Sequence, residues 1–194
     1  PLILPYAGVV PAFATPLAYA GEGSAILGRV TLGRNAWIGP RAVLRADGHV
    51  VQAGDDFHAG ARTTLHIAHE VFPCIVGNRV TVGEDACVHA CNVGSDVIVG
   101  DGTVILDGAI VGDNVIFEAG STVFPGKRIE GGYVYAGSPA KMVRPVEAGE
   151  VARRRETMLA AHKDKAVNAA GSSIAASSKI DPSVFIASTA RVRG

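Results

Sequence analysis

The stretch "NVGSDVIVGDGTVILDGAIVGDNVIF" (92–117) carries an apolar residue at every sixth position, and glycine follows several of them directly. Such a repeat is typical of a β-solenoid, in which short strands alternate with corners and the repeated apolar residue fills the interior. Glycine relieves the crowding at the corners. The repeated positions are Val93, Val99, Ile105, Val111 and Phe117.

The same spacing extends toward the N-terminus, where it links Leu32, Ile38, Leu44 and Val50, and then Val76, Val82 and Val88. An ordinary β-sandwich would place its strands about 8–12 residues apart and would not keep a six-residue phase. Three hexapeptides complete one triangular coil. The pattern therefore predicts an all-β solenoid. It resembles the left-handed parallel β-helix of the hexapeptide-repeat family, which implies such a fold with strands over about residues 20–126, within a domain that spans 1–146. Residues 56–75 lose the phase, which predicts a loop that leaves the coil there.

Composition limits the function further. The 194 residues contain 18 basic and 18 acidic side chains, so nothing indicates a nucleic-acid partner. No stretch of about 20 apolar residues exists, and we expect no transmembrane segment. The three cysteines have no CxxC spacing, which argues against a disulfide framework and for a reducing compartment. The positive mean hydropathy of +0.27 suggests apolar surface that is buried against other subunits.

The chain changes character after the repeat. Residues 147–166 are rich in helix formers, contain no proline and carry Glu147 and Glu150 near their start, which predicts a helix packed on the solenoid. Residues 167–194 are expected to be a linker and an extended tail. Within this tail, 180–194 resembles a solenoid strand, and we expect it to pair with an exposed β edge of this or a neighbouring chain.

Several motifs in the middle of the chain are similar to those of the γ-class carbonic anhydrases and their relatives, which include the carbonic-anhydrase-like subunits of mitochondrial complex I. The resemblance covers most of residues 20–146. The motifs are "VLRAD" (43–47), "TTLHIA" (63–68), "IVGNRVTVG" (75–83), "VHAC" (88–91) and "ILDGAIVG" (105–112).

The resemblance implies a trimer with a metal site between subunits, in which three histidines bind the metal. Two of these positions are His66 and His89 here, and the third is Glu84. Two imidazoles and a carboxylate with an open fourth position form a legitimate catalytic zinc set. The other interpretation is that Glu84 is a solvated corner residue. We keep Zn as a possible cofactor, with His66, His89 and Glu84 as its candidate ligands.

Other positions of the family pattern bear on activity. Arg45 and Asp47 are retained, whereas the family's water-orienting Gln and its Asp are replaced by Gly60 and Ala61, which have no side-chain hydrogen-bonding group. The family's Asn is replaced by His58, either a loop histidine or a substitute ligand or proton relay. His69 and Glu70, beside His66, are expected to be exposed loop residues.

These substitutions favour a γ-carbonic-anhydrase-like trimer subunit with a degenerate metal site and a structural or assembly role. The resemblance implies homo- or heterotrimers with related subunits, in a larger membrane complex or alone. It also implies either the matrix side of the mitochondrial inner membrane or the bacterial cytoplasm. Two alternatives stay open: an active zinc-dependent carbonic anhydrase, and a hexapeptide-repeat acyltransferase, since fold alone does not settle function.

Overall fold

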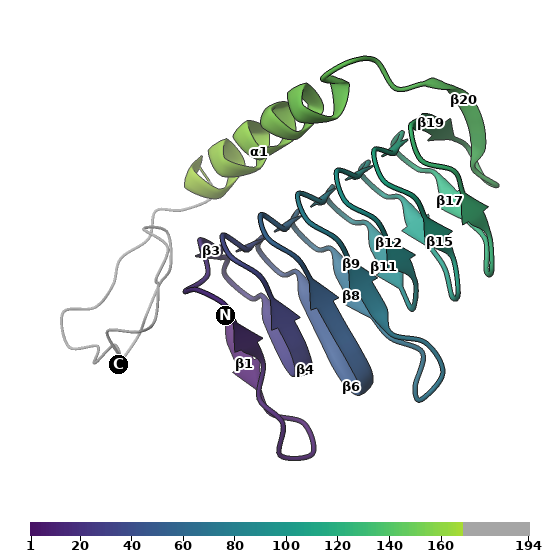
Figure 1. The fold of residues 1–194 in the computed structure, drawn as a ribbon. Coiled ribbons are helices and arrows are strands. Elements are labelled where there is room, and N and C mark those ends of the chain that lie inside the picture. The colour runs from purple at the N-terminus through teal and green to yellow at the C-terminus, as the bar shows by residue number, and fades with distance from the viewer. Residues whose placement is uncertain (169–194) are drawn as a thin grey trace.

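The computed structural model describes residues 1–168, which form a parallel β-helix with a single helix, α1 (Glu150–Asn168), along one face (Figure 1). The predicted left-handed β-helix is confirmed. The coils begin earlier and end later than 20–126, and α1 begins and ends slightly later than 147–166. The prediction for the tail at 180–194 lies outside the described residues.

Three columns of stacked strands build the solenoid. Column A contains β4 (Ala25–Leu32), β6 (Val43–Ala53), β8 (Thr64–His66), β11 (Cys87–His89), β14 (Val104–Ile105) and β17 (Thr122–Val123). The long strands β4 and β6 bend into column B and continue there with β9 (Cys74–Val76), β12 (Asn92–Val93), β15 (Ile110–Val111) and β18 (Arg128–Ile129). At the N-terminal end, β1 (Leu2–Leu4) and β2 (Ala12–Phe13) pair with β4.

Column C is a separate sheet, and its outer face carries α1 (Figure 1). It is parallel except at its C-terminal edge, where β20 pairs antiparallel with β19. Its strands are β3 (Tyr19–Ala20), β5 (Trp37–Ile38), β7 (His58–Ala59), β10 (Thr81–Val82), β13 (Ile98–Val99), β16 (Ile116–Phe117), β19 (Tyr133–Ala136) and β20 (Lys141–Pro145).

The repeated apolar residues fill the interior, as the six-residue phase predicts, except that Val50 is half-buried and Ala53 takes the inward position of its coil. Val99 of β13, Ile105 of β14 and Phe117 of β16 are fully buried. Burying one such side chain stabilises a fold by about 1.5–3 kcal/mol relative to leaving it in water. The stack of coils therefore encloses one continuous apolar core.

The glycines that follow the apolar residues are required by close approach between coils. A Cβ on Gly94 would lie 2.8 Å from the carbonyl carbon of Gly112 in the next coil, and a Cβ on Gly100 would lie 2.6 Å from the Ala119 nitrogen. No such approach is tolerated between real side chains and backbone. The corners thus stack backbone on backbone, which keeps successive coils in one register.

The prediction of a loop over 56–75 was wrong in its extent. Phe57, Ala59 and Leu65 are fully buried, so β7 and β8 are ordinary parts of a coil. Within this range, the chain leaves the coil between β8 and β9, where Ala68 and Phe72 form an isolated antiparallel bridge. Small side chains at inward positions, such as Ala59, concealed the repeat because they do not stand out as apolar residues in the sequence.

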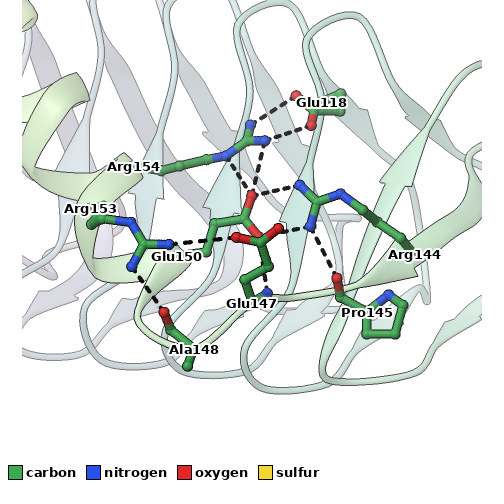
Figure 2. A network of polar contacts seen from close by, with 8 residues as sticks. All are labelled: Glu118, Arg144, Pro145, Glu147, Ala148, Glu150, Arg153 and Arg154. Atoms are coloured by element: carbon green, nitrogen blue, oxygen red, sulfur yellow. Dashed lines mark hydrogen bonds and ion pairs between the residues drawn. The ribbon is translucent and has the colours of Figure 1, made fainter.

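Helix α1 is attached to column C by an apolar contact and by a polar network. Val151 and Met158 pack against outward-facing apolar residues of β13, β16 and β19. Figure 2 shows Arg154 bonded to both carboxylate oxygens of Glu118, at 2.8 and 2.9 Å, and Glu150 bonded to Arg144 at 2.7 and 2.9 Å. Within residues 1–168, the helix is not apolar enough to cross a membrane.

Candidate functional site

His66 and His89 meet at the corner between columns A and B, which we call the AB corner. They occupy equivalent positions at the ends of β8 and β11, in neighbouring coils. His66 Nδ1 lies 3.1 Å from His89 Nε2, and the two rings are tilted by 54°. Parallel in-register pairing of the two strands is what brings the two histidines together.

A carboxylate contacts each histidine on its outer side. His66 Nε2 lies 3.1 Å from Asp47 Oδ1, and His89 Nδ1 lies 2.6 Å from Asp107 Oδ1. Four successive coils therefore contribute one group each, in the order Asp47, His66, His89, Asp107. Burial opposes ionisation of Asp47, but its hydrogen bonds with Arg45 and His66 outweigh this and lower its pKa.

The donors and acceptors of this chain leave one position for a cation. An ionised carboxylate only accepts hydrogen bonds, so His66 donates from Nε2 to Asp47 and His89 donates from Nδ1 to Asp107. The two remaining ring nitrogens then face each other with lone pairs. At 3.1 Å these lone pairs repel unless a proton or a metal ion lies between them.

Glu84 lies at the opposite end of column A, at the corner with column C. Its carboxylate accepts hydrogen bonds from Arg62 at 3.1 Å and from Lys165 of α1 at 2.8 Å. Burial acts in the other direction, yet these cations lower the pKa of Glu84 below its ordinary value. Within one chain, Glu84 is therefore not brought together with His66 and His89.

Gly60 and Ala61 belong to the same corner as Glu84. Gly60 follows β7, and its Cα faces the backbone of Gly83 and Glu84 in the next coil. Arg45 is one of the family positions that this chain retains. It lies next to His66 in the strand register and donates a hydrogen bond to Asp47. The retained residues thus gather at the AB corner, and the replaced residues gather at the other end of column A.

His58 is not a loop histidine. It belongs to β7, is 1% exposed, and lies under α1 with its Nε2 atom 2.7 Å from His162 Nδ1. Its ring stacks on Trp37 with centroids 4.1 Å apart. Burial lowers the pKa of His58 to about 2, and its Nδ1 atom has no partner among the described residues. His58 therefore holds α1 in place as a neutral ring.

His69 and Glu70 are exposed, as predicted, on the short loop between β8 and β9. The side chain of His69 is 64% exposed and that of Glu70 81%. The ring of His69 occupies the space beside Gly48, where a Cβ would overlap with it. At the far end of the loop, the ring of Phe72 lies over Gly108.

Asp107 is the site residue that the sequence did not reveal. It lies in "ILDGAIVG", a motif that carries the family resemblance, but an aspartate at a solenoid corner usually caps the backbone. The available signal was its position one coil after His89, at the same corner. That signal becomes usable only when the register of the coils is known.

The outer face of column A carries no charged side chain along its central row. The row runs through six coils in register and all of its members are half-buried. Its members are Ala25, Val43, Thr64, Cys87, Val104 and Thr122. The AB corner with its histidines borders this row on one side, and Glu84 borders it on the other.

The described part of the chain holds no complete metal site by itself. Across residues 1–168, no three His, Cys, Asp or Glu side chains are grouped so that they could hold a metal ion. The His66–His89 pair therefore supplies two ligands at most from one chain, together with its two carboxylate partners.

Comparisons with known proteins agree with the fold. Residues 90–125 match the bacterial transferase hexapeptide (six repeats) family. The chain is 33% identical over 138 residues to "Gamma carbonic anhydrase 2, mitochondrial" of Arabidopsis thaliana, which covers 69% of this chain and 50% of that protein. The chain thus spans half the length of this relative.

Two further relatives are covered over most of their length. Protein YrdA of Escherichia coli (strain K12) is 37% identical over 140 residues, which is 69% of this chain and 76% of that protein. A crystal structure of a hexapeptide transferase family protein from Anaplasma phagocytophilum superposes with a TM-score of 0.75 at 30% identity. It covers 84% of this chain and 97% of that one. The six-residue coils, the paired histidines and these relatives together place the chain in the γ-carbonic-anhydrase-like family of hexapeptide-repeat proteins.

Proposed function

We propose that this chain is a subunit of a γ-carbonic-anhydrase-like trimer in which His66 and His89 bind a divalent metal ion, zinc first, at the junction between chains. We further propose that carbon dioxide hydration at this site is weak and that the main role of the subunit is structural. The observation that carries the proposal is the His66–His89 pair, held between two carboxylates.

The donor set fits zinc. Tetrahedral zinc with Zn–N bonds of about 2.0–2.1 Å places two ligand nitrogens about 3.3–3.4 Å apart. The facing nitrogens of His66 and His89 are 3.1 Å apart, so a small movement of either ring would suffice. Neutral imidazoles whose other nitrogen donates to a carboxylate are the usual ligands of such sites.

The third ligand is proposed to come from a second chain. Glu84 and His89 lie at opposite ends of column A, and the uncharged row between them is a suitable surface for a copy of the fold. A homotrimer would offer the neighbour's Glu84 to the histidine pair. A heterotrimer would instead offer a histidine from a partner that retains one, and this arrangement would suit a larger membrane assembly.

Weak catalysis follows from the residues around the site. When bound, zinc makes water acidic enough to provide hydroxide near neutral pH. This chain must then orient that water, yet Gly60 and Ala61 have no side-chain donor or acceptor. Glu84 must also leave Arg62 and Lys165 before it can bind a metal, because both cations hold its carboxylate.

Metal analysis and stopped-flow kinetics test the proposal. We expect protein produced with zinc to retain the metal and to hydrate carbon dioxide far below the kcat of about 10⁶ s⁻¹ that efficient zinc anhydrases reach. We expect His66→Ala and His89→Ala to lose the metal, whereas His69→Ala, an exposed histidine on the adjacent loop, should retain it. Full zinc retention by a variant that carries both His66→Ala and His89→Ala would contradict the proposed site. A rate of carbon dioxide hydration near that of efficient anhydrases would contradict the proposed structural role.

The second candidate is an acyltransferase, which the match to the bacterial transferase hexapeptide family favours. A cavity of about 420 Å³ lies beside β2, β4 and β6, with Asp55 and Asn78 among its lining residues. No histidine lines it, so the general base that such transfer requires would have to come from elsewhere. Acetyl transfer from acetyl-CoA to small amines or sugars would support this candidate.

A further inference from the structure

We propose that Asp107 is a positioning residue of the metal site: it fixes the ring orientation and tautomer of His89, so that His89 Nε2 is available to a metal ion. This inference rests on the proposed role of the His66–His89 pair. It adds a residue that acts through His89 and does not itself contact the metal ion.

Asp107 differs from three aspartates that cap the backbone at other solenoid corners. Asp55, Asp101 and Asp113 each accept a hydrogen bond from a backbone N–H of a neighbouring coil. Among the described residues, the carboxylate of Asp107 hydrogen-bonds only to His89, at 2.6 Å. Its side chain therefore has no backbone-capping role, and its one contact is with the site.

The backbone holds Asp107 in place relative to His89. The next residue, Gly108, donates its N–H to the carbonyl of Ala90 at 2.8 Å, which ties the two corners together directly beside the histidine. Gly108 has a φ of 67°, and the ring of Phe72 lies 3.4 Å from the position that a Cβ would take. The loop between β8 and β9 thus covers the turn that presents the carboxylate.

The tautomer follows from this contact. Because Asp107 accepts from Nδ1, the proton of neutral His89 resides there and Nε2 keeps its lone pair. Without the carboxylate, the proton can move to Nε2, which blocks the nitrogen that faces His66. Removing such an outer partner of a ligand typically weakens metal affinity about 10–100-fold.

Three variants in the full chain test the proposal. Asp107→Ala removes the acceptor, and Asp107→Asn keeps an oxygen acceptor but removes the charge. Asp113→Ala is the matched control, because Asp113 makes a contact of the same length, 2.6 Å, to the backbone of Ser95. Zinc affinity is measured by competition with a chromophoric chelator, and thermal unfolding is measured for each variant.

We expect Asp107→Ala to bind zinc about 10–100-fold more weakly, Asp107→Asn to lose less, and Asp113→Ala to keep its affinity even if it unfolds at a lower temperature. The tautomer is read in metal-free protein labelled with ¹⁵N-histidine, by long-range NMR correlations in alkaline buffer. His89 should carry its proton on Nδ1 in the wild type and in Asp113→Ala, and should shift toward Nε2 in Asp107→Ala.

The two measurements separate the two proposals. If the wild type binds no zinc but His89 shows the Nδ1–H form only when Asp107 is present, the proposed metal site fails, whereas the control of the His89 tautomer by Asp107 stands. If zinc binds and neither affinity nor tautomer changes in Asp107→Ala, the positioning role is wrong and the metal site stands. An equal loss of affinity in Asp113→Ala would also overturn the proposal, because it would indicate a general structural effect.

Discussion

Glu84 stands where the family pattern places its second metal-binding histidine, and its carboxylate lies between the guanidinium of Arg62 and the ammonium of Lys165. In this chain the position therefore carries a charged group that is already paired. Exposed ion pairs contribute little, about 0–1 kcal/mol each, so a neighbouring chain could still displace them. At the residue scale, the proposed site would combine two imidazoles with a carboxylate that must first leave its ion pairs.

His58 provides the first prediction, which concerns pH. Its pKa falls from 6.5 to about 2 on folding, mainly because of burial. The unfolded state therefore binds more protons below pH 6.5, and the folded state loses stability as the pH falls below that value. We expect chemical-denaturation midpoints to decrease steadily from about pH 6.5 downward, and we expect His58→Phe, which keeps a ring against Trp37, to reduce this slope.

The charged groups around the buried His58–His162 pair are included in this expectation. Arg155 and Lys163 disfavour a positive charge on His58, whereas Glu84 and Asp101 favour one on His162. Burial also lowers the pKa of His162, so both rings resist protonation. A wild-type slope that His58→Phe leaves unchanged would show that other groups cause the acid sensitivity.

At the scale of elements, α1 is held by few apolar contacts and by the Glu150 network (Figure 2). Glu150 is central because it accepts from Arg144, from Arg154 and from the backbone N–H of Glu147 at the helix start. The Arg144 guanidinium is the main reason that the pKa of Glu150 falls to about 2. The side chain of Glu150 is 9% exposed, so solvent cannot replace these partners easily.

The second prediction is that Glu150→Gln loosens α1. A lost hydrogen bond to a charged group costs about 1.5–3 kcal/mol. The substitution turns one acceptor oxygen of Glu150 into an amide nitrogen and removes the charge from an acceptor of four hydrogen bonds. We expect faster hydrogen exchange along α1 and a lower denaturation midpoint, with exchange in column B unchanged. Glu147→Gln is the matched control: the Glu147 side chain is 72% exposed and lies 3.9 Å from Arg153. Equal effects of the two substitutions would show that the network does not hold the helix.

The sequence predicted those elements whose inward residues are large. Val93, Val99 and Ile105 made the coils from β12 onward visible, because each fills the interior with a branched side chain. The coil that contains Ala59 was read as a loop, since alanine is common at any position. His66 and His89 were recognisable from motifs, whereas the contacts of His58 and Asp107 depend on packing between distant segments, which no local pattern encodes.

At the scale of the whole molecule, the uncharged row of column A is the surface most suited to a second copy. The third prediction is that the protein is a trimer in solution and that Val104→Lys dissociates it, because a charge in the centre of this row would be buried without a partner. Asn92→Lys, on the exposed outer row of column B, is the control and should remain trimeric. Analytical ultracentrifugation measures both.

Labelling of the Cys87 thiol is an independent test of the same interface, with the same two proteins. Its half-buried thiol lies within the row, and burial raises its pKa. The thiol should be protected from a bulky maleimide in the trimer and should react in Val104→Lys. A wild-type protein that is monomeric at micromolar concentration, or a Val104→Lys variant that stays trimeric, would contradict the proposed interface.

The spacing of inward residues is uniform at two corners of the coil and irregular at the third. Steps around the other corners keep six residues, but three successive steps across the AB corner do not: Leu44 to Ala53, Leu65 to Val76 and Val88 to Val93. These three coils supply Asp47, His66 and His89. Insertions and deletions are therefore tolerated at this corner without disturbing the stacked backbone elsewhere. Related proteins can diverge in activity by changing segment length at one place, and grafting a foreign loop between β8 and β9 should alter the site while preserving the fold.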